Sequence, residues 1–161
     1  MTTSELIRAN LLSVRKELLE VVPHLSDDIL NWAPAAGMRT IRGQFAEILG
    51  TEVSLLEALT GSSRKEYEAL EAEYKAIPTV KGLIEAADEV RAKTLAYMDG
   101  LTEADFVAPA SVSEGFAQWQ EMNPVPVAEV LRLIARHEYY HVGQLFSYLW
   151  AKGDNPYTWD E

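Results

Sequence analysis

The sequence predicts an all-α protein that folds as an up-down four-helix bundle. Four long segments carry apolar residues at the three- and four-residue spacing of amphipathic helices, and glycine or proline residues separate them. No segment alternates apolar and polar residues in the way that a half-buried strand does. A chain of 161 residues is long enough to bury a hydrophobic core, so we expect one domain over residues 1–161.

The first two helices are predicted by their caps and their apolar stripes. Thr3 or Ser4 suits the N-cap of the first helix, and Pro23 ends that helix. Thr40 suits the N-cap of the second helix, and Gly61 ends it. The first stripe comprises Leu6, Ile7, Leu11, Val14, Leu18 and Val22. The second comprises Ile41, Phe45, Ile48, Leu49, Leu55, Leu56 and Leu59. Each stripe gives its helix one apolar face for packing against other helices.

Two further long helices are predicted in the second half of the chain. Thr79 opens the third helix and Gly100 ends it, while Pro126 suits the first turn of a fourth helix that extends to about Lys152. The third stripe comprises Leu83, Ile84, Ala87, Val90, Leu95 and Met98.

Two connections between the long helices are also informative. The charged segment 64–75 predicts a short surface helix, and segment 105–126 predicts a long irregular loop. Such long loops are often functional.

Composition and charge exclude several classes of protein. The 25 acidic residues outnumber the 14 basic ones, giving a net charge of −11 that disfavours binding to nucleic acids or anionic lipids. The absence of cysteine excludes disulfides, thiolate metal sites and a catalytic thiol. Neither a signal peptide nor an apolar run of the ~18 residues that span a bilayer is visible. We therefore expect a cytoplasmic protein.

The most informative motif is the histidine pair His137 and His141 in the predicted fourth helix. Residues four apart on a helix lie about 40° apart around its axis, so the two imidazoles point the same way and can share one metal ion. Both lie beside the apolar stripe of the helix and face other helices. A pair of inward histidines is harder to explain as core packing than a single one, because each needs its own polar partner.

The same residues, with Glu138, also match the H-E-x-x-H pattern of zinc peptidases. In that interpretation Glu138 is the general base. However, no H-x-x-G-x-x-H extension follows, and only twenty residues remain after His141 for a third ligand. The sequence also lacks a strand that could align an extended peptide. Peptidase activity is therefore disfavoured.

A family resemblance adds to this motif. The segment containing His137, His141, Gly143 and Gln144 resembles the H-x-x-x-H-x-G-Q signature of DinB/YfiT-like proteins. The family segment T-h-x-x-x-h-x-H-h-x-x-x-E, where h is hydrophobic, is matched in the second helix by Thr40, Ile41, Phe45, Ile48 and Glu52. The resemblance covers most of the chain and implies a metal-binding four-helix protein, usually a homodimer.

One position departs from the family pattern. Glu47 stands where the family usually has its first metal-binding histidine. The resemblance therefore implies a site of Glu47, His137 and His141, which suits Zn²⁺, Ni²⁺, Fe²⁺ or Mn²⁺, or a site that has been weakened or lost. The helical wheel alone instead places Glu52 near the apolar centre of the second helix, so Glu52 is an alternative ligand or a partner of the ligands. If Glu52 is not a ligand, it can pair with an arginine.

Several other side chains are weaker candidates. Glu138 and Gln144 could support the ligands, because both lie close to the histidines on the fourth helix. Tyr139, Tyr140 and Trp119 could line the site, although aromatic residues in a helical bundle are mostly packing residues.

The resemblance implies three functional classes. The first is a metal-dependent transferase that activates a low-molecular-weight thiol, such as bacillithiol or mycothiol, for attack on a small-molecule electrophile. The second is a metal-dependent hydrolase with Glu138 or Glu52 as the base. The third is a non-catalytic stress or binding protein with a vestigial metal site. Fold alone does not decide among them, because function lies in the site.

Overall fold

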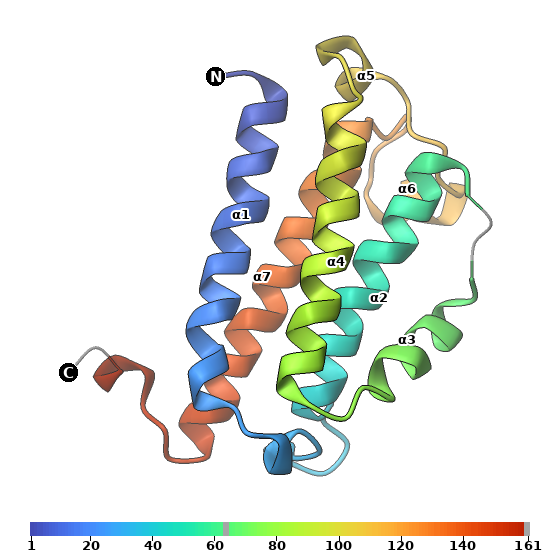
Figure 1. The fold of residues 1–161 in the computed structure, drawn as a ribbon. Helices are drawn as coiled ribbons and strands as arrows, with labels where there is room; N and C mark the ends of the chain where they lie inside the picture. Colours follow the sequence, from blue (N-terminus) through green and yellow to red (C-terminus); the bar gives the residue numbers. More distant parts are fainter. Residues whose placement is uncertain (63–64, 160–161) are drawn as a thin grey trace.

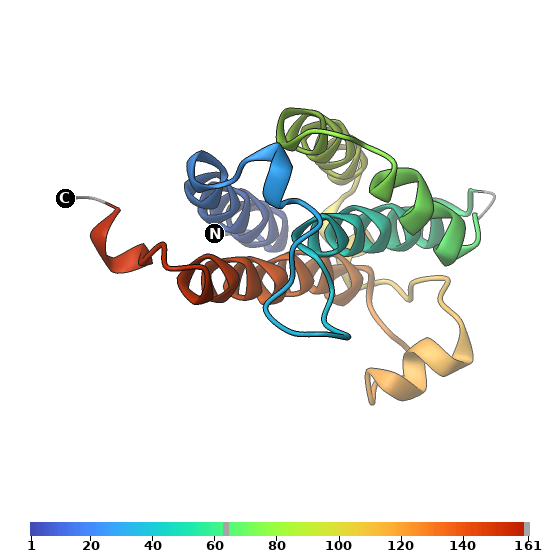
Figure 2. The ribbon, with the colours of Figure 1, turned by 90° about the horizontal axis from the view of Figure 1, so that it is seen from below.

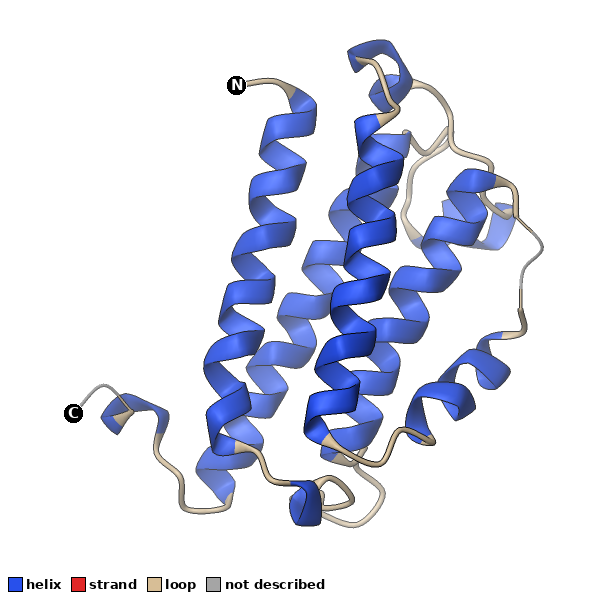
Figure 3. Cartoon of the chain, in the orientation of Figure 1, coloured by secondary structure: helices blue, strands red, loops and turns tan. Residues whose placement is uncertain are grey.

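Four long helices lie side by side and form the body of the molecule (Figures 1 and 3). The computed structural model describes residues 1–62 and 65–159, and within these residues every regular element is helical. The long helices are α1 (Thr3–Val21), α2 (Ile41–Thr60), α4 (Val80–Asp99) and α7 (Val127–Ala151). The prediction of an all-α protein is confirmed.

Shorter helices fill the connections. They are η1 (Val22–His24), η2 (Asp27–Ile29), α3 (Tyr67–Lys75), α5 (Glu103–Val107), α6 (Glu114–Trp119) and η3 (Pro156–Thr158). The predicted surface helix over 64–75 is observed as α3, although Arg64 itself lies outside the described residues. The long loop before the last helix is less irregular than expected, because it contains both α5 and α6.

Local sequence explains where the long helices begin and end. Thr2, one residue earlier than predicted, caps α1 in a reciprocal capping box with Glu5. Thr40 and Thr79 cap α2 and α4 by accepting a hydrogen bond from the third residue of each helix. Gly61 ends α2 in the left-handed conformation, with φ of 68°, which residues with a Cβ rarely adopt.

In the view from below, α2 and α7 run across the picture, and α1 and α4 lie on one side of α7 (Figure 2). α1 and α2 each pack against α7. The shared core contains the apolar stripes of all four helices, including Leu11, Phe45, Leu83 and Leu145, which are fully buried. α3 lies outside the four long helices and packs on α2 (Figure 2).

The helix directions differ from a strict up-down order. Arg42, at the start of α2, donates to the carbonyl of Ile77 just before α4, and Glu52 further along α2 pairs with Arg91 further along α4. α2 and α4 are therefore parallel. The reason is α3 and its linkers, which bring the chain back along the outside of α2 before α4 begins (Figure 1). None of the described helices combines the length and apolar character needed to cross a membrane.

Candidate metal centre

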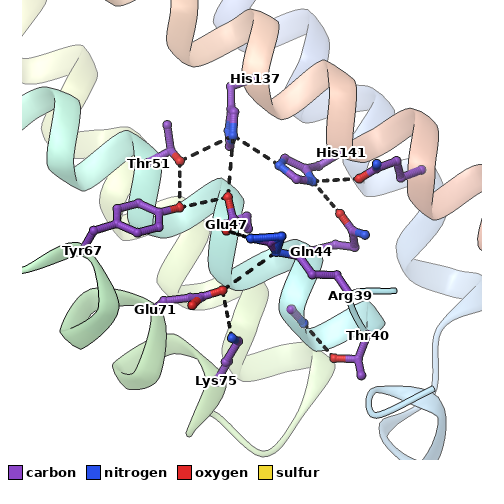
Figure 4. Close-up of polar contacts among 12 residues, drawn as sticks. Arg39, Thr40, Gln44, Glu47, Thr51, Tyr67, Glu71, Lys75, His137 and His141 are labelled. Atoms are coloured by element: carbon purple, nitrogen blue, oxygen red, sulfur yellow. Dashed lines mark hydrogen bonds and ion pairs between the residues drawn. The ribbon is translucent and has the colours of Figure 1, made fainter. Parts of the chain in front are cut away.

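Glu47, His137 and His141 meet where α2 packs against α7 (Figure 4). One ligand atom from each residue lies within 4.8 Å of the other two. The two imidazole Nε2 atoms are 3.2 Å apart, and His137 Nε2 is 3.9 Å from Glu47 Oε2. The sequence therefore identified three residues that the fold brings together, two from one turn of α7 and one from α2.

The geometry can be compared with that of a bound ion. Zinc binds imidazole nitrogen and carboxylate oxygen at about 2.0–2.2 Å, so two ligands of a tetrahedral ion are about 3.4 Å apart. The two histidines already approach this spacing, whereas the carboxylate, 3.9 Å from His137 Nε2, has to move closer to both histidines. Two nitrogens and one oxygen also form a donor set that suits Zn²⁺ and the other first-row divalent metals. The residues present therefore fit a divalent metal.

Two glutamine side chains orient His141. Its Nδ1 lies within hydrogen-bond distance of the amide oxygens of Gln44 and Gln144, the latter at 3.0 Å. Because amide oxygens only accept, Nδ1 carries the proton and donates it, and the Nε2 lone pair is left for a metal. Gln44 is held in turn by donating to the hydroxyl of Tyr148 at 3.0 Å. The predicted supporting role of Gln144 agrees with this position.

Both histidines are in the form that binds metals at neutral pH. Burial lowers the pKa of His141 to about 4, and the neighbouring His137 acts in the same direction. Burial also lowers the pKa of His137, although the negative charge of Glu47 opposes the shift. Neutral imidazole is the ligand form, so a metal at this site would not have to displace protons from the histidines near pH 7.

Both oxygens of the Glu47 carboxylate have partners. Arg39 donates to Oε1, and the hydroxyl of Tyr67 donates to Oε2 at 3.0 Å. Burial raises the pKa of Tyr67 to about 12, so the hydroxyl remains a donor over the physiological range. Thr51 completes the cluster, with its hydroxyl 3.1 Å from that of Tyr67 and 3.5 Å from His137 Nε2 (Figure 4).

Glu52 and Glu138 point into a different part of the core. Glu138 accepts hydrogen bonds from Arg15 and Arg91, and Glu52 accepts two from Arg91 at 2.8 and 3.0 Å. Thr94 donates a further hydrogen bond to Glu52 at 2.7 Å. The four charged residues, one from each long helix, are all buried. The helical wheel was therefore right that Glu52 faces inward, but its partners are arginines.

Two pockets reach the histidine pair from the surface. The first, with a volume of about 450 Å³, is lined by His137, Trp119, Arg136 and Tyr140 together with Gln120, Glu121 and Leu133. The second, of about 260 Å³, brings Arg39, Gln44 and His141 together on the other side of Tyr140. The predicted place of Trp119 beside the histidines agrees with the first pocket.

Sequence reasoning missed four residues of this cluster: Arg39, Gln44, Thr51 and Tyr67. A signal for two of them was present, because Gln44, Glu47 and Thr51 follow the spacing i, i+3, i+7 and form one polar stripe on α2. No comparable signal marks Arg39 or Tyr67. They reach Glu47 from the loop before α2 and from α3, and only the fold brings them there.

The chain is similar to known proteins in its sequence family and in its fold. No curated protein matched its sequence. A crystal structure described as the conserved protein of locus from Enterococcus faecalis has a similar fold, with a TM-score of 0.73 and 14% sequence identity over 94% of this chain and 97% of that chain. A family model for the DinB superfamily matches residues 10–145, which is most of the sequence. The chain therefore belongs to the DinB superfamily.

Proposed function

We propose that this protein binds one divalent metal through Glu47, His137 and His141 and is a metal-dependent transferase that joins a small-molecule thiol to an electrophile. The observation that carries the proposal is the pair of neutral imidazoles whose Nε2 atoms lie 3.2 Å apart, with a carboxylate beside them. Three protein ligands leave coordination positions open, as catalytic metal sites do.

The ion, when bound, would act as a Lewis acid that lowers the pKa of the thiol. In the transfer itself, the thiol sulfur forms a bond to carbon, the leaving group departs with the electrons of its bond, and the thiol proton is released. Gln44 and Gln144 keep the His141 lone pair directed at the site, and Tyr67 holds the carboxylate of Glu47. The pocket between His137 and Trp119 has the size of a small-molecule site.

A hydrolase in which Glu138 or Glu52 serves as the base is less well supported. Both carboxylates accept hydrogen bonds from buried arginines, so neither is a free base beside the histidines. Thiol transfer does not need such a base. A hydrolase would lose activity with a chelator and would need no thiol, so the two functions are separated by omitting the thiol from the assay.

Metal analysis of protein purified without a histidine tag tests the site. We expect near-stoichiometric metal after incubation with Zn²⁺, Ni²⁺, Fe²⁺ or Mn²⁺ and removal of excess ion, and at least a tenfold loss of affinity in His137→Ala, which removes a ligand. His24→Ala is the matched control. His24 pairs with Asp154 and stacks on Trp159, outside the metal centre, so its loss should leave the metal content unchanged.

Outcomes then separate the candidate functions. Bound metal with thiol-dependent consumption of an electrophile such as monochlorobimane, using bacillithiol or mycothiol as the donor, supports the transferase. If the protein binds metal but shows no thiol transfer, the metal site is supported and the transferase function is contradicted. A wild-type protein that binds none of these ions would mean that Glu47 marks a lost site, and the non-catalytic alternative would replace the proposal.

We also propose that the chain forms one cytoplasmic domain and assembles as a homodimer. Support for the dimer comes from large apolar side chains on α1 and α7 that are about half exposed, among them Leu12, Leu19 and Tyr139. Light scattering coupled to size-exclusion chromatography measures the assembly directly, and a monomeric mass at micromolar concentration would contradict it.

A further inference from the structure

We propose that Arg39 is an internal cation that competes with the metal for Glu47, and that Glu71 receives the arginine when the metal binds. The inference rests on the metal site proposed above and concerns what controls its affinity. The observation behind it is that one guanidinium lies between two carboxylates from two helices (Figure 4). Arg39 donates to Glu47 Oε1, while its Nε is 3.9 Å from Glu71 Oε1.

The present contacts hold Glu47 slightly away from the histidines. The two imidazole nitrogens are 3.2 Å apart, but the nearest carboxylate oxygen is 3.9 Å from His137 Nε2. Arg39 binds one oxygen of this carboxylate and Tyr67 the other. We expect movement of the carboxylate toward a shared ion to lengthen its contact with the arginine. The guanidinium therefore neutralises the charge that a metal would neutralise.

Arg39 is placed so that its side chain can move without disturbing the fold. The residue lies in the loop immediately before the N-cap of α2, and its side chain is 45% exposed. Its backbone is fixed independently, because the hydroxyl of Tyr148 donates to the Arg39 carbonyl at 3.0 Å. A change of rotamer can thus carry the guanidinium away from Glu47 while the start of α2 remains in place.

Glu71 is suited to accept the arginine. Its side chain is 19% exposed, and at present its main partner is Lys75, one turn later on α3 at 2.8 Å. A carboxylate can accept from two cationic groups at once, so Arg39 can join Lys75 there. Glu71 lies on the same helix as Tyr67, whose hydroxyl contacts Glu47. The exchange therefore occurs within one network of neighbouring side chains.

Zinc titration of the metal-free protein by calorimetry tests the competition. Removing a positive charge a few ångströms from the ion should raise affinity, so we expect Arg39→Gln to bind Zn²⁺ roughly tenfold more tightly, after allowance for solvent screening. Arg39→Lys keeps the charge and should stay within about threefold of the wild type. Arg132→Gln is the matched control for net charge, because Arg132 is exposed and pairs with Glu129 on α7.

A double-mutant cycle tests the role of Glu71. Glu71→Gln removes the alternative partner of Arg39, so it should weaken zinc binding several-fold in the wild-type background and by less than about twofold in the Arg39→Gln background. Equal weakening of zinc binding in both backgrounds would show that Glu71 acts only through its charge. That result would contradict the proposed transfer of Arg39 from Glu47 to Glu71.

The remaining outcomes separate this inference from the metal site itself. If the wild type binds zinc and Arg39→Gln binds it equally or more weakly, Arg39 orients Glu47 for the ion, and the competition is overturned while the site remains. If only Arg39→Gln binds zinc, the competition is strongly supported. If neither protein binds zinc, both the competition and the site fail.

Discussion

His141 and Glu47 illustrate how single residues acquire their properties from neighbours that lie far away in the sequence. His141 is buried against α2 and has its Nδ1 proton shared between Gln44 and Gln144. Burial and the nearby His137 hold its pKa near 4. Glu47 is nearly buried as well, but its partners Arg39 and Tyr67 supply the donors that an anion needs. One cluster therefore combines a neutral base and a paired anion.

The depressed pKa of His141 predicts how the stability of the metal-free protein depends on pH. The unfolded chain protonates His141 near pH 6.5, whereas the folded protein does so only near pH 4, so the unfolded state takes up more protons between these values. The free energy of unfolding should therefore fall as the pH is lowered from 6.5 to 4, by roughly 2–3 kcal/mol from this group. Urea denaturation at a series of pH values, with a chelator present, measures the change.

A variant without the titrating group provides the control for this prediction. His141→Gln removes this ionisation and should make the curve less steep between pH 4 and 6.5, whatever the stability of the variant at pH 7. His137, whose pKa burial also lowers, still contributes to the remaining slope. His24→Gln is the matched histidine substitution outside the metal centre, where His24 contacts Asp154 and Trp159. An unchanged curve in His141→Gln would show that other groups cause the acid sensitivity.

Much of this site could be predicted from residue spacing. The rest could not be predicted, and the reason is physical. The i, i+4 spacing placed His137 and His141 on one face of the helix. Glu47 was selected by its position in the family sequence pattern and not by the helical wheel of apolar residues. For Glu52 the sequence left two alternatives open, a metal ligand or a partner of an arginine, and the structure shows the second. For Glu138 no such partner was predicted, because a helical wheel shows which way a side chain points but not which side chain it contacts. Their arginine partners lie on α1 and α4.

At the scale of the helices, the buried charges tie the four long elements together. Arg15 of α1, Glu52 of α2, Arg91 of α4 and Glu138 of α7 form one connected group in the core. Because each carboxylate contacts both arginines, the relative register of all four helices is fixed at this level. Buried ion pairs of this kind add little net stability compared with apolar packing, but breaking one is costly.

Removing one charge from this group tests its structural role. Glu138→Gln leaves Arg15 and Arg91 with less compensating charge in the core, so the free energy of unfolding should fall by about 3 kcal/mol. Because Glu138 is not among the proposed ligands, zinc binding by the folded variant should change less than threefold. Urea denaturation and zinc titration measure the two quantities.

An exposed pair on α4 supplies the comparison. Glu85 lies 3.6 Å from Lys81, and both side chains are mostly exposed, so Glu85→Gln should change the stability by less than about 0.5 kcal/mol. The structural assignment of Glu138 would be contradicted by a variant that keeps its stability but loses zinc binding, since that pattern belongs to a residue of the metal site.

The element boundaries were more predictable than the directions of the helices. Threonine caps and glycine or proline stops marked α2, α4 and the start of α7 in the sequence. The parallel arrangement of α2 and α4 was not predictable in the same way. It depends on α3, which runs back along α2 before α4 begins. A charged amphipathic helix has the same sequence pattern whether it forms such a return connection or only lies on the surface.

For the molecule as a whole, the dominant electrostatic feature is its charge of −11 at pH 7. Several exposed pairs on α4 and elsewhere bring opposite charges together, but acidic residues remain in excess over the surface. Mutual repulsion among them destabilises the compact state, while the same field attracts divalent cations toward the protein. The charge therefore favours loading of a metal and opposes folding of the metal-free chain.

Salt should consequently stabilise the metal-free protein. The Debye length falls from about 30 Å at 0.01 M to below about 5 Å at 0.5 M, which screens repulsion between exposed charges but leaves the buried group of Arg15 and its partners largely unaffected. We expect the free energy of unfolding to rise by about 1 kcal/mol over this range, measured by urea denaturation in sodium chloride with a chelator present. A fall with salt would mean that attractive surface pairs outweigh the excess charge. Replacing the exposed residues Glu20 and Glu68 by lysine raises the net charge by two units at each position. These variants should show a smaller salt effect, because less repulsion remains for the salt to screen.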